Sequence, residues 1–167
     1  MIKGIFHLTK KSKSKRINFY LDFGVQIRKK YPEGVTLTIA EILEYTITLS
    51  DNVGCDVLLE LLGRPQAVED YFRRNNFKNI SIKINEETMQ NNWDLQFQNW
   101  TTPKETNKIL QSFYDNKDSL LSQKSYDFVW QMMKATQTGK KRLKGQLPKG
   151  TVVAHKTGWS GANKKQE

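Results

Sequence analysis

The strongest constraint on the fold is a succession of capped amphipathic helices that begins in the fourth decade of the chain. Thr38-Ile39-Ala40-Glu41 has the pattern of a capping box, and apolar residues follow it at helical spacing. Ser50-Asp51-Asn52 ends that helix and supplies caps for the next one, which we expect to end at Gly63. Thr102-Pro103-Lys104-Glu105 and Ser122 begin two further helices by the same logic. With one more helix after Gly63, roughly five helices are predicted.

Extended structure is favoured in two short segments. Residues 80–84 alternate apolar and polar side chains, as a short strand does. Residues 151–156 (Thr-Val-Val-Ala-His-Lys) are rich in β-forming residues and follow a break at Pro148-Lys149-Gly150. A lone strand leaves backbone groups unpaired, so we expect the domain to be cut off beyond it. The predicted fold class is α+β, mostly helical, with one strand of an antiparallel sheet.

Length and composition indicate one folded domain. The chain has 167 residues, of which 37% are hydrophobic and 11% aromatic. No apolar run approaches the roughly 18 residues that a membrane-spanning helix needs, so we expect no membrane span. Cys55 is the single cysteine, which excludes an internal disulfide and a zinc cluster built from thiolates. It lies in an apolar helical stretch, and we expect a packed thiol there and not a reactive one.

The positive charge is concentrated at the start of the chain. Residues 1–30 hold nine Lys or Arg and one acid, so they carry eight of the ten net positive charges. We expect residues 1–30 to be a basic, disordered tail whose Lys/Ser-rich run 10–16 is unstructured, and residues 31–167 to be the domain. A basic tail could also bind nucleic acid or anionic lipid, which makes a non-enzymatic binding module one alternative.

Two short motifs about a hundred residues apart carry the chemistry. In Ser50-Asp51-Asn52, the serine hydroxyl can both donate and accept a proton, and the asparagine amide can hold a substrate carbonyl. In Lys156-Thr157-Gly158, the lysine supplies positive potential, the threonine offers a hydroxyl to a carboxylate, and the glycine allows close approach. These are two of the three elements of a serine-acylating β-lactam site.

At this point a resemblance becomes specific. Residues 43–59 around Ser50-Asp51-Asn52 resemble class A serine β-lactamases, as do Asn85-Glu86-Glu87, residues 99–103 and His155-Lys156-Thr157-Gly158. The likeness runs from about residue 31 to residue 161 and corresponds to only the middle of a full-length enzyme, so we expect a domain truncated at both ends. Members hydrolyse β-lactams through a serine acyl-enzyme, without metal or other cofactor, in the periplasm or after secretion.

The resemblance assigns roles residue by residue. The catalytic residues it implies are Ser50 as proton relay, Glu86 as the base that activates the deacylating water, and Lys156 as the cationic group. The implied substrate-binding residues are Asn52, Thr157, Gly158 and Arg142, and Asp56 tethers the loop that carries the base. Two assignments have alternatives: the base could be the neighbouring Glu87, and Arg142 could belong to the solvated basic face formed with Lys140, Lys141 and Lys144.

Several positions depart from the family pattern. Many members pair an acid with an arginine where this chain has Asn99 and Ile84, so that ion pair is absent. Gln90 stands where an asparagine commonly holds the hydrolytic water, and Trp159 follows the Lys-Thr-Gly motif where the family has a smaller residue.

The nucleophile is the largest departure. Ser12-Lys13-Ser14-Lys15 fits the Ser-x-x-Lys pattern literally, but it lies in a cationic run only 38 residues before Ser50. No apolar helical face surrounds it, and an exposed tail cannot hold a serine within ~3 Å of its base. We therefore assign no nucleophile and expect the chain to be inactive alone.

One further interpretation remains open beside the non-enzymatic binding module. A penicillin-binding D,D-peptidase relative shares Ser-x-Asn and Lys-Thr-Gly, but Glu86 argues against it. Residues 1–9 lack the apolar core and cleavage site of a signal peptide, so this chain would be cytoplasmic if expressed as written. The expected partner is a small β-lactam. Nucleic acid is the least favoured of the partners considered. The predicted strand at 151–156 could mediate self-association.

Overall fold

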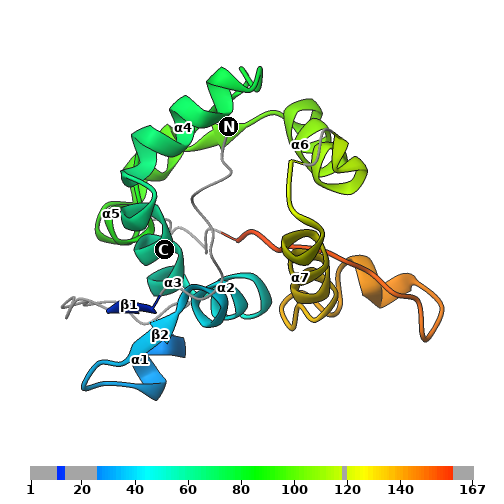
Figure 1. Cartoon of the computed structure of the whole chain (residues 1–167), viewed down its shortest axis with the longest axis horizontal. Coiled ribbons are helices and arrows are strands. Elements are labelled where there is room, and N and C mark those ends of the chain that lie inside the picture. Colours follow the sequence, from blue (N-terminus) through cyan, green and yellow to red (C-terminus); the bar gives the residue numbers. More distant parts are fainter. Residues whose placement is uncertain (1–10, 14–25, 118–119, 160–167) are drawn as a thin grey trace, which may run out of the picture.

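The computed structural model describes residues 11–13, 26–117 and 120–159, with side chains placed from residue 26 onward (Figure 1). The helices are α1 (Gln26–Lys30), α2 (Ile39–Thr48), α3 (Asn52–Leu61), α4 (Arg64–Arg74), α5 (Glu86–Asn91), α6 (Pro103–Asp115) and α7 (Gln123–Lys134), with 3-10 turns η1 (Trp93–Gln98) and η3 (Leu143–Gln146). The short strands are β1 (Lys11–Lys13), β2 (Thr36–Thr38), β3 (Ile80–Ser81) and β4 (Trp100–Thr101).

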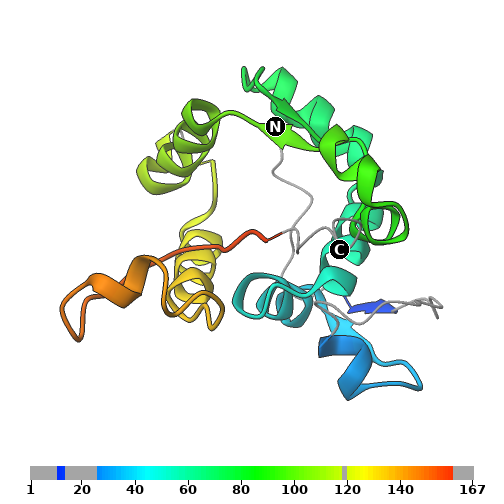
Figure 2. The same ribbon diagram turned by 180° about the vertical axis from the view of Figure 1, so that it is seen from behind.

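The helices are arranged around α3. Helix α3 contacts α1, α2, α4 and α5, while α2 also contacts α7. Both views show α2 to α5 on one side of the molecule and α6 and α7 on the other, with α2 and α7 joining the two sides (Figures 1 and 2). The mostly helical architecture with small antiparallel pairings agrees with the predicted α+β class. No helix among the described residues is long and apolar enough to cross a membrane.

Capping chemistry starts the helices where the sequence predicts. The Thr38 hydroxyl accepts from the Glu41 N–H (3.2 Å), and the Glu41 carboxylate accepts from the Thr38 N–H (2.7 Å), which completes a capping box before α2. Side chains also cap α3, α6 and α7, from Asp51, Thr102 and Ser122 respectively. These four predicted helix starts are confirmed.

A small apolar core lies where α1, β2, α2 and α3 meet. Ile27, Leu37 and Ile42 are buried there. Residues packed against them are Tyr31, Val35, Tyr45, Val57 and Leu58. Gly54 allows the close packing of α3 on α2, because a Cβ at that position would collide with the Thr46 hydroxyl. The core therefore fixes the α2–α3 junction, which contains Ser50-Asp51-Asn52.

The N-terminal region is more ordered than the sequence predicts at two places. Residues 11–13 form β1, which pairs antiparallel with β2, and residues 26–30 form α1. The prediction that the run 10–16 is unstructured is therefore wrong for residues 11–13. Backbone pairing with β2 supplies the partner that the sequence pattern could not reveal. The remaining residues of the predicted tail lie outside the described part.

The predicted extended segments are shorter than expected. Of residues 80–84, only Ile80 and Ser81 form a strand, β3, which pairs with β4. Residues 151–159 have no strand assignment, because no strand among the described residues forms a ladder of hydrogen bonds with their backbone. The strand predicted over 151–156 is thus wrong for this chain as described. Self-association through this segment stays a prediction.

Candidate functional site

Ser50 is placed by the turn that joins α2 to α3. Its φ is 58°, in the left-handed region that few non-glycine residues adopt. The next residue, Asp51, is 1% exposed, and its carboxylate accepts from the Gly54 N–H (2.8 Å) and the Ile27 N–H (2.9 Å). Asp51 therefore both caps α3 and ties α1 to it. Burial raises the pKa of Asp51, although these backbone donors oppose that shift.

The segment that carries Lys156 is pinned to the end of α7. The His155 N–H donates to the Met133 carbonyl (3.2 Å), and the Thr136 hydroxyl donates to the His155 carbonyl (2.7 Å). The His155 ring nitrogen Nε2 also lies 3.1 Å from the Thr138 carbonyl. Thr136 and His155 are both buried. These contacts hold the extended segment in place without a strand partner.

The same region of α7 is joined to α2. The Gln137 N–H donates to the Thr48 carbonyl (2.9 Å), two residues before Ser50. As a result, Lys156 Nζ contacts the Ser50 hydroxyl oxygen across 106 positions of sequence, and it also donates to the Thr157 carbonyl (2.8 Å). The fold thus brings the two sequence motifs together, as the family resemblance implies.

Glu86 is the first residue of α5, and Asp56 fixes the start of this helix. The two carboxylate oxygens of Asp56 accept from the Glu86 N–H (2.8 Å) and the Glu87 N–H (2.9 Å). The predicted tethering role of Asp56 is confirmed by these bonds. Burial and then the Asp56 charge raise the pKa of Glu86, whereas Lys156 opposes the shift. Burial lowers the pKa of Lys156, and Cys55 and then Glu86 oppose that change.

Cys55 lies on α3 beside this group of charges. Burial, then the negative charges of Glu86 and Asp56, raise the pKa of the Cys55 thiol to about 12. A thiol with such a pKa is protonated at neutral pH and therefore a weak nucleophile. This agrees with the prediction of a packed, unreactive cysteine.

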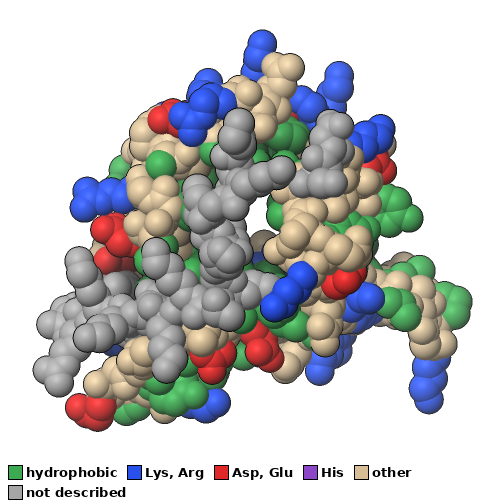
Figure 3. Space-filling view, in the orientation of Figure 1, with side chains coloured by type: hydrophobic (Ala, Val, Ile, Leu, Met, Phe, Trp, Pro, Cys, Tyr) green, Lys and Arg blue, Asp and Glu red, His purple; other side chains and the backbone are tan. Residues whose placement is uncertain are grey.

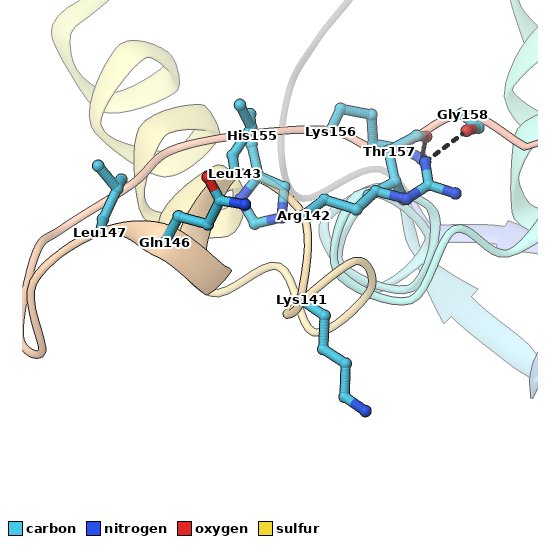
Figure 4. A pocket seen from close by; sticks show the side chains of 9 residues that line it. All are labelled: Lys141, Arg142, Leu143, Gln146, Leu147, His155, Lys156, Thr157 and Gly158. Atoms are coloured by element: carbon cyan, nitrogen blue, oxygen red, sulfur yellow. Dashed lines mark hydrogen bonds between the residues drawn. The ribbon is translucent and has the colours of Figure 1, made fainter.

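Thr157, Gly158 and Arg142 form the outer side of the site. The hydroxyls of Thr157 and Thr138 are 2.6 Å apart, and Arg142 Nη1 donates to the Gly158 carbonyl (3.0 Å). Gly139 has a φ of 67°, and a Cβ there would collide with the Thr157 methyl group, so glycine is required. Figure 4 shows Arg142 extended along the Lys156–Gly158 segment.

A pocket of about 700 Å³ lies on the Arg142 side of the segment (Figure 4). Its lining residues are Lys141, Arg142, Leu143, Gln146, Leu147, His155, Lys156, Thr157 and Gly158. Ser50 and Glu86 do not line it, so this pocket and the Ser50–Lys156 contact are neighbouring features that share Lys156. Asn52, the remaining predicted residue, begins α3 two positions after Ser50 and is half-buried.

Sequence reasoning missed the residues that brace the loop before Glu86. Glu69, 1% exposed on α4, accepts from the Ile82 N–H (2.9 Å) and binds the Lys83 and Arg73 side chains. Burial opposes ionisation of Glu69, but these donors lower its pKa to about 2. A glutamate on an exposed-looking helical pattern gives no sequence signal of such a role.

Among the described residues, no group of three or more His, Cys, Asp or Glu is placed to hold a metal ion.

Comparisons with known proteins agree with this arrangement. Residues 6–165 match the beta-lactamase enzyme family. The chain is 56% identical over 137 residues to Beta-lactamase VEB-1 of Pseudomonas aeruginosa, covering 82% of this chain and 46% of that protein. It is 43% identical over 126 residues to Extended-spectrum beta-lactamase PER-1 of the same organism, covering 75% and 40% respectively.

A solved structure shows the same likeness in three dimensions. The crystal structure of the TLA-1 extended-spectrum beta-lactamase superposes with a TM-score of 0.84 at 45% identity, covering 95% of this chain and 57% of that one. The chain spans less than half the length of the two curated relatives. Family match, sequence identity and superposition together place the chain in the beta-lactamase enzyme family, among its class A members.

Proposed function

We propose that this chain contributes the relay, base and cationic groups of a β-lactam-hydrolysing site that works through a serine acyl-enzyme. The observation that carries the proposal is the contact between Lys156 Nζ and the Ser50 hydroxyl, which joins the two motifs. In this proposal, Ser50 passes a proton to the leaving β-lactam nitrogen. The Lys156 cation makes the Ser50 hydroxyl a better proton donor and attracts the anionic substrate.

Glu86 is the proposed base for release of the acyl group. A general base works best when its pKa lies near the working pH, and the pKa of Glu86 is shifted upward by burial and Asp56. Glu86 would take a proton from water as the water attacks the acyl carbonyl. Asp56 supports this role by holding the first turn of α5 through two backbone N–H groups.

The proposed substrate-binding residues lie in or beside the same two motifs. Asn52 is proposed to hold the substrate amide, and Thr157 and Gly158 its carboxylate. Arg142 is proposed to add positive potential, an action supported by its bond to the Gly158 carbonyl, which orients the guanidinium along the motif. The site would need no metal or cofactor, because proton transfer and charge stabilisation come from these side chains.

A nucleic-acid partner has less support. On the face shown in Figure 3, Lys and Arg side chains are scattered over the described residues, with Asp and Glu side chains among them. A binding groove for nucleic acid usually gathers cations along one continuous track. The β-lactam site is therefore the better-supported function.

The proposal is tested by separating binding from turnover. We expect the 167-residue chain to show no steady-state nitrocefin hydrolysis, because no placed nucleophile accompanies the relay. It should still bind benzylpenicillin, and Lys156→Ala should weaken that binding about tenfold or more. Lys149→Ala, which removes an exposed lysine from the turn at 148–150, is the matched control. Turnover that disappears in Ser12→Ala, or binding that is insensitive to Lys156, would contradict the proposal.

A further inference from the structure

We propose that Ser50 and Lys156 form a nucleophile–base pair that accepts an acyl group from small activated esters. This activity goes beyond the proposed function, in which Ser50 only relays a proton and another residue carries the acyl group. It rests on the Ser50–Lys156 contact alone, so it stands or falls independently of the role proposed for Glu86.

The geometry has the three parts that an activated nucleophile needs. The Ser50 hydroxyl and Lys156 Nζ are in direct contact, which is the nucleophile–base relationship. The base is in turn oriented, because Nζ also donates to the Thr157 carbonyl at 2.8 Å. Ser50 is half-buried and Lys156 keeps part of its surface open to solvent, so a small ester can reach the pair.

The backbone holds Ser50 in an uncommon conformation. Its φ of 58° is maintained between the end of α2 and the buried Asp51 cap, and the Asp51 N–H donates to the Tyr45 carbonyl at 3.3 Å. Such strained residues persist where the surrounding structure over-determines them, and they cluster at reactive positions. The turn thus places Ser50 where its hydroxyl meets Lys156.

The surroundings of Lys156 favour the neutral form of its amine more than water does for an exposed lysine. Burial lowers the pKa of Lys156. The titratable groups that face it are Cys55 from α3 and Glu86 from α5, and both oppose this shift without cancelling it. When the amine is neutral, its lone pair can accept the Ser50 proton across the same contact.

The reaction is a simple acyl transfer. As Ser50 Oγ forms a bond to the ester carbonyl carbon, its proton passes to Lys156 Nζ. The carbon–oxygen bond to the leaving group then breaks, and the leaving group departs with the electron pair as its anion. Lys156 returns to the neutral amine by releasing its proton to water. The products are O-acyl-Ser50 and the free leaving group, with no oxidant, metal or cofactor involved.

The experiment uses the full chain and 4-nitrophenyl acetate, with release of nitrophenolate followed by absorbance and the acetylated residue located by peptide mass spectrometry. We expect one acetyl group at Ser50. Ser50→Gly is the first variant, because glycine accepts the positive φ while removing the hydroxyl, and it should abolish labelling at this position. Ser50→Cys should retain it, since a thiol can replace the hydroxyl as nucleophile.

Lysine variants separate proton acceptance from charge. Lys156→Arg keeps the cation but cannot be deprotonated, so it should lower the labelling rate about 100-fold or more. Lys149→Ala should leave it unchanged, and labelling of the unaltered chain should rise with pH as Lys156 loses its proton. Acetylation on Lys156 itself, labelling spread over surface lysines, or an equal rate in Lys156→Arg would each overturn the proposal. Circular dichroism of every variant verifies that the fold is kept.

Discussion

The Asn99 side chain forms hydrogen bonds with both the N–H and the carbonyl of Ile84. Asn99 Oδ1 accepts from the Ile84 N–H (3.1 Å), and Asn99 Nδ2 donates to the Ile84 carbonyl (2.9 Å). The same Oδ1 also accepts from the Lys83 N–H (2.8 Å). These bonds join the two ends of the loop that contains α5 and Glu86. Where many family members have an acid–arginine ion pair, this chain thus has the uncharged amide of Asn99.

Removing this amide should loosen the loop. Asn99→Ala leaves two backbone N–H groups and one carbonyl without their partner, so we expect a loss of about 1–3 kcal/mol in unfolding free energy. Hydrogen exchange at the Lys83 and Ile84 amides should accelerate as well. Because the interaction is neutral, the protection in the unaltered chain should change little with added salt. Asn91→Ala, an exposed position at the end of α5, is the control, and equal losses in the two variants would contradict this account.

Glu69 should make the chain sensitive to acid. Its folded-state pKa is about 2, below its ordinary value of 4.5, so the ionised form favours the folded state. The stabilisation is present above about pH 4.5 and is lost as the pH falls toward 2. Asp51, Asp56 and Glu86 have raised pKa values and act in the opposite direction, so the difference between two chains is the useful quantity.

Glu69→Gln provides that comparison. Its melting temperature should lie below that of the unaltered chain at neutral pH, and the gap should narrow as the pH falls toward 2, because Glu69 then takes up a proton and loses the charge that glutamine lacks. Asp70→Asn, at the half-buried neighbouring acid of the same helix, should show no such convergence. A gap that is constant with pH would contradict the assignment of Glu69 as an ionised brace.

Gly139 should tolerate no side chain. Its positive φ and the collision of a Cβ with the Thr157 methyl group predict that Gly139→Ala loses about 1–3 kcal/mol of stability and displaces Thr157. Gly145→Ala is the matched control, because its φ is ordinary and its nearest neighbours lie at normal contact distance, the first at 3.7 Å. Thermal melts of both variants measure the difference. Equal stability of the two would show that the Gly139 turn is not strained.

Cys55 offers a probe of the α3–α5 contact. With a pKa of about 12, its thiol should react with a disulfide reagent at pH 8 at least about 100-fold more slowly than in the guanidinium-unfolded chain. Asp56→Ala removes the acceptor for the Glu86 and Glu87 N–H groups and one nearby negative charge, so the reaction should accelerate. Rapid modification of the folded, unaltered chain would contradict the placement of Cys55.

Local chemistry explains which features were predictable from sequence. The helix caps depend on residues three positions apart, so Thr38 and Thr102 could be identified from their neighbours. The pairing of Ser50 with Lys156 followed from the family resemblance and not from local pattern. Asp51 was expected as a cap, but its bond to the Ile27 N–H depends on a contact 24 positions away.

The features that could not be predicted depend on distant partners. β1 exists because β2 pairs with it, and residues 151–156 lack strand pairing because their backbone has no such neighbour among the described residues. Glu69 looks like an ordinary helix-surface acid until Ile82 and Lys83 are placed against it. Asn99 was noted as the loss of an ion pair, whereas its three backbone hydrogen bonds could be seen only in the folded chain.

The central claim is that Ser50, Glu86 and Lys156 serve one β-lactam-hydrolysing site. The most direct measurement replaces the 137 aligned residues of Beta-lactamase VEB-1 with those of this chain and follows nitrocefin hydrolysis by the chimera. We predict turnover, a fall of about 100-fold or more with an accumulating acyl-enzyme in Glu86→Gln, and little change in Glu87→Gln. A chimera whose turnover survives Glu86→Gln, or is lost in Glu87→Gln instead, would contradict the assignment.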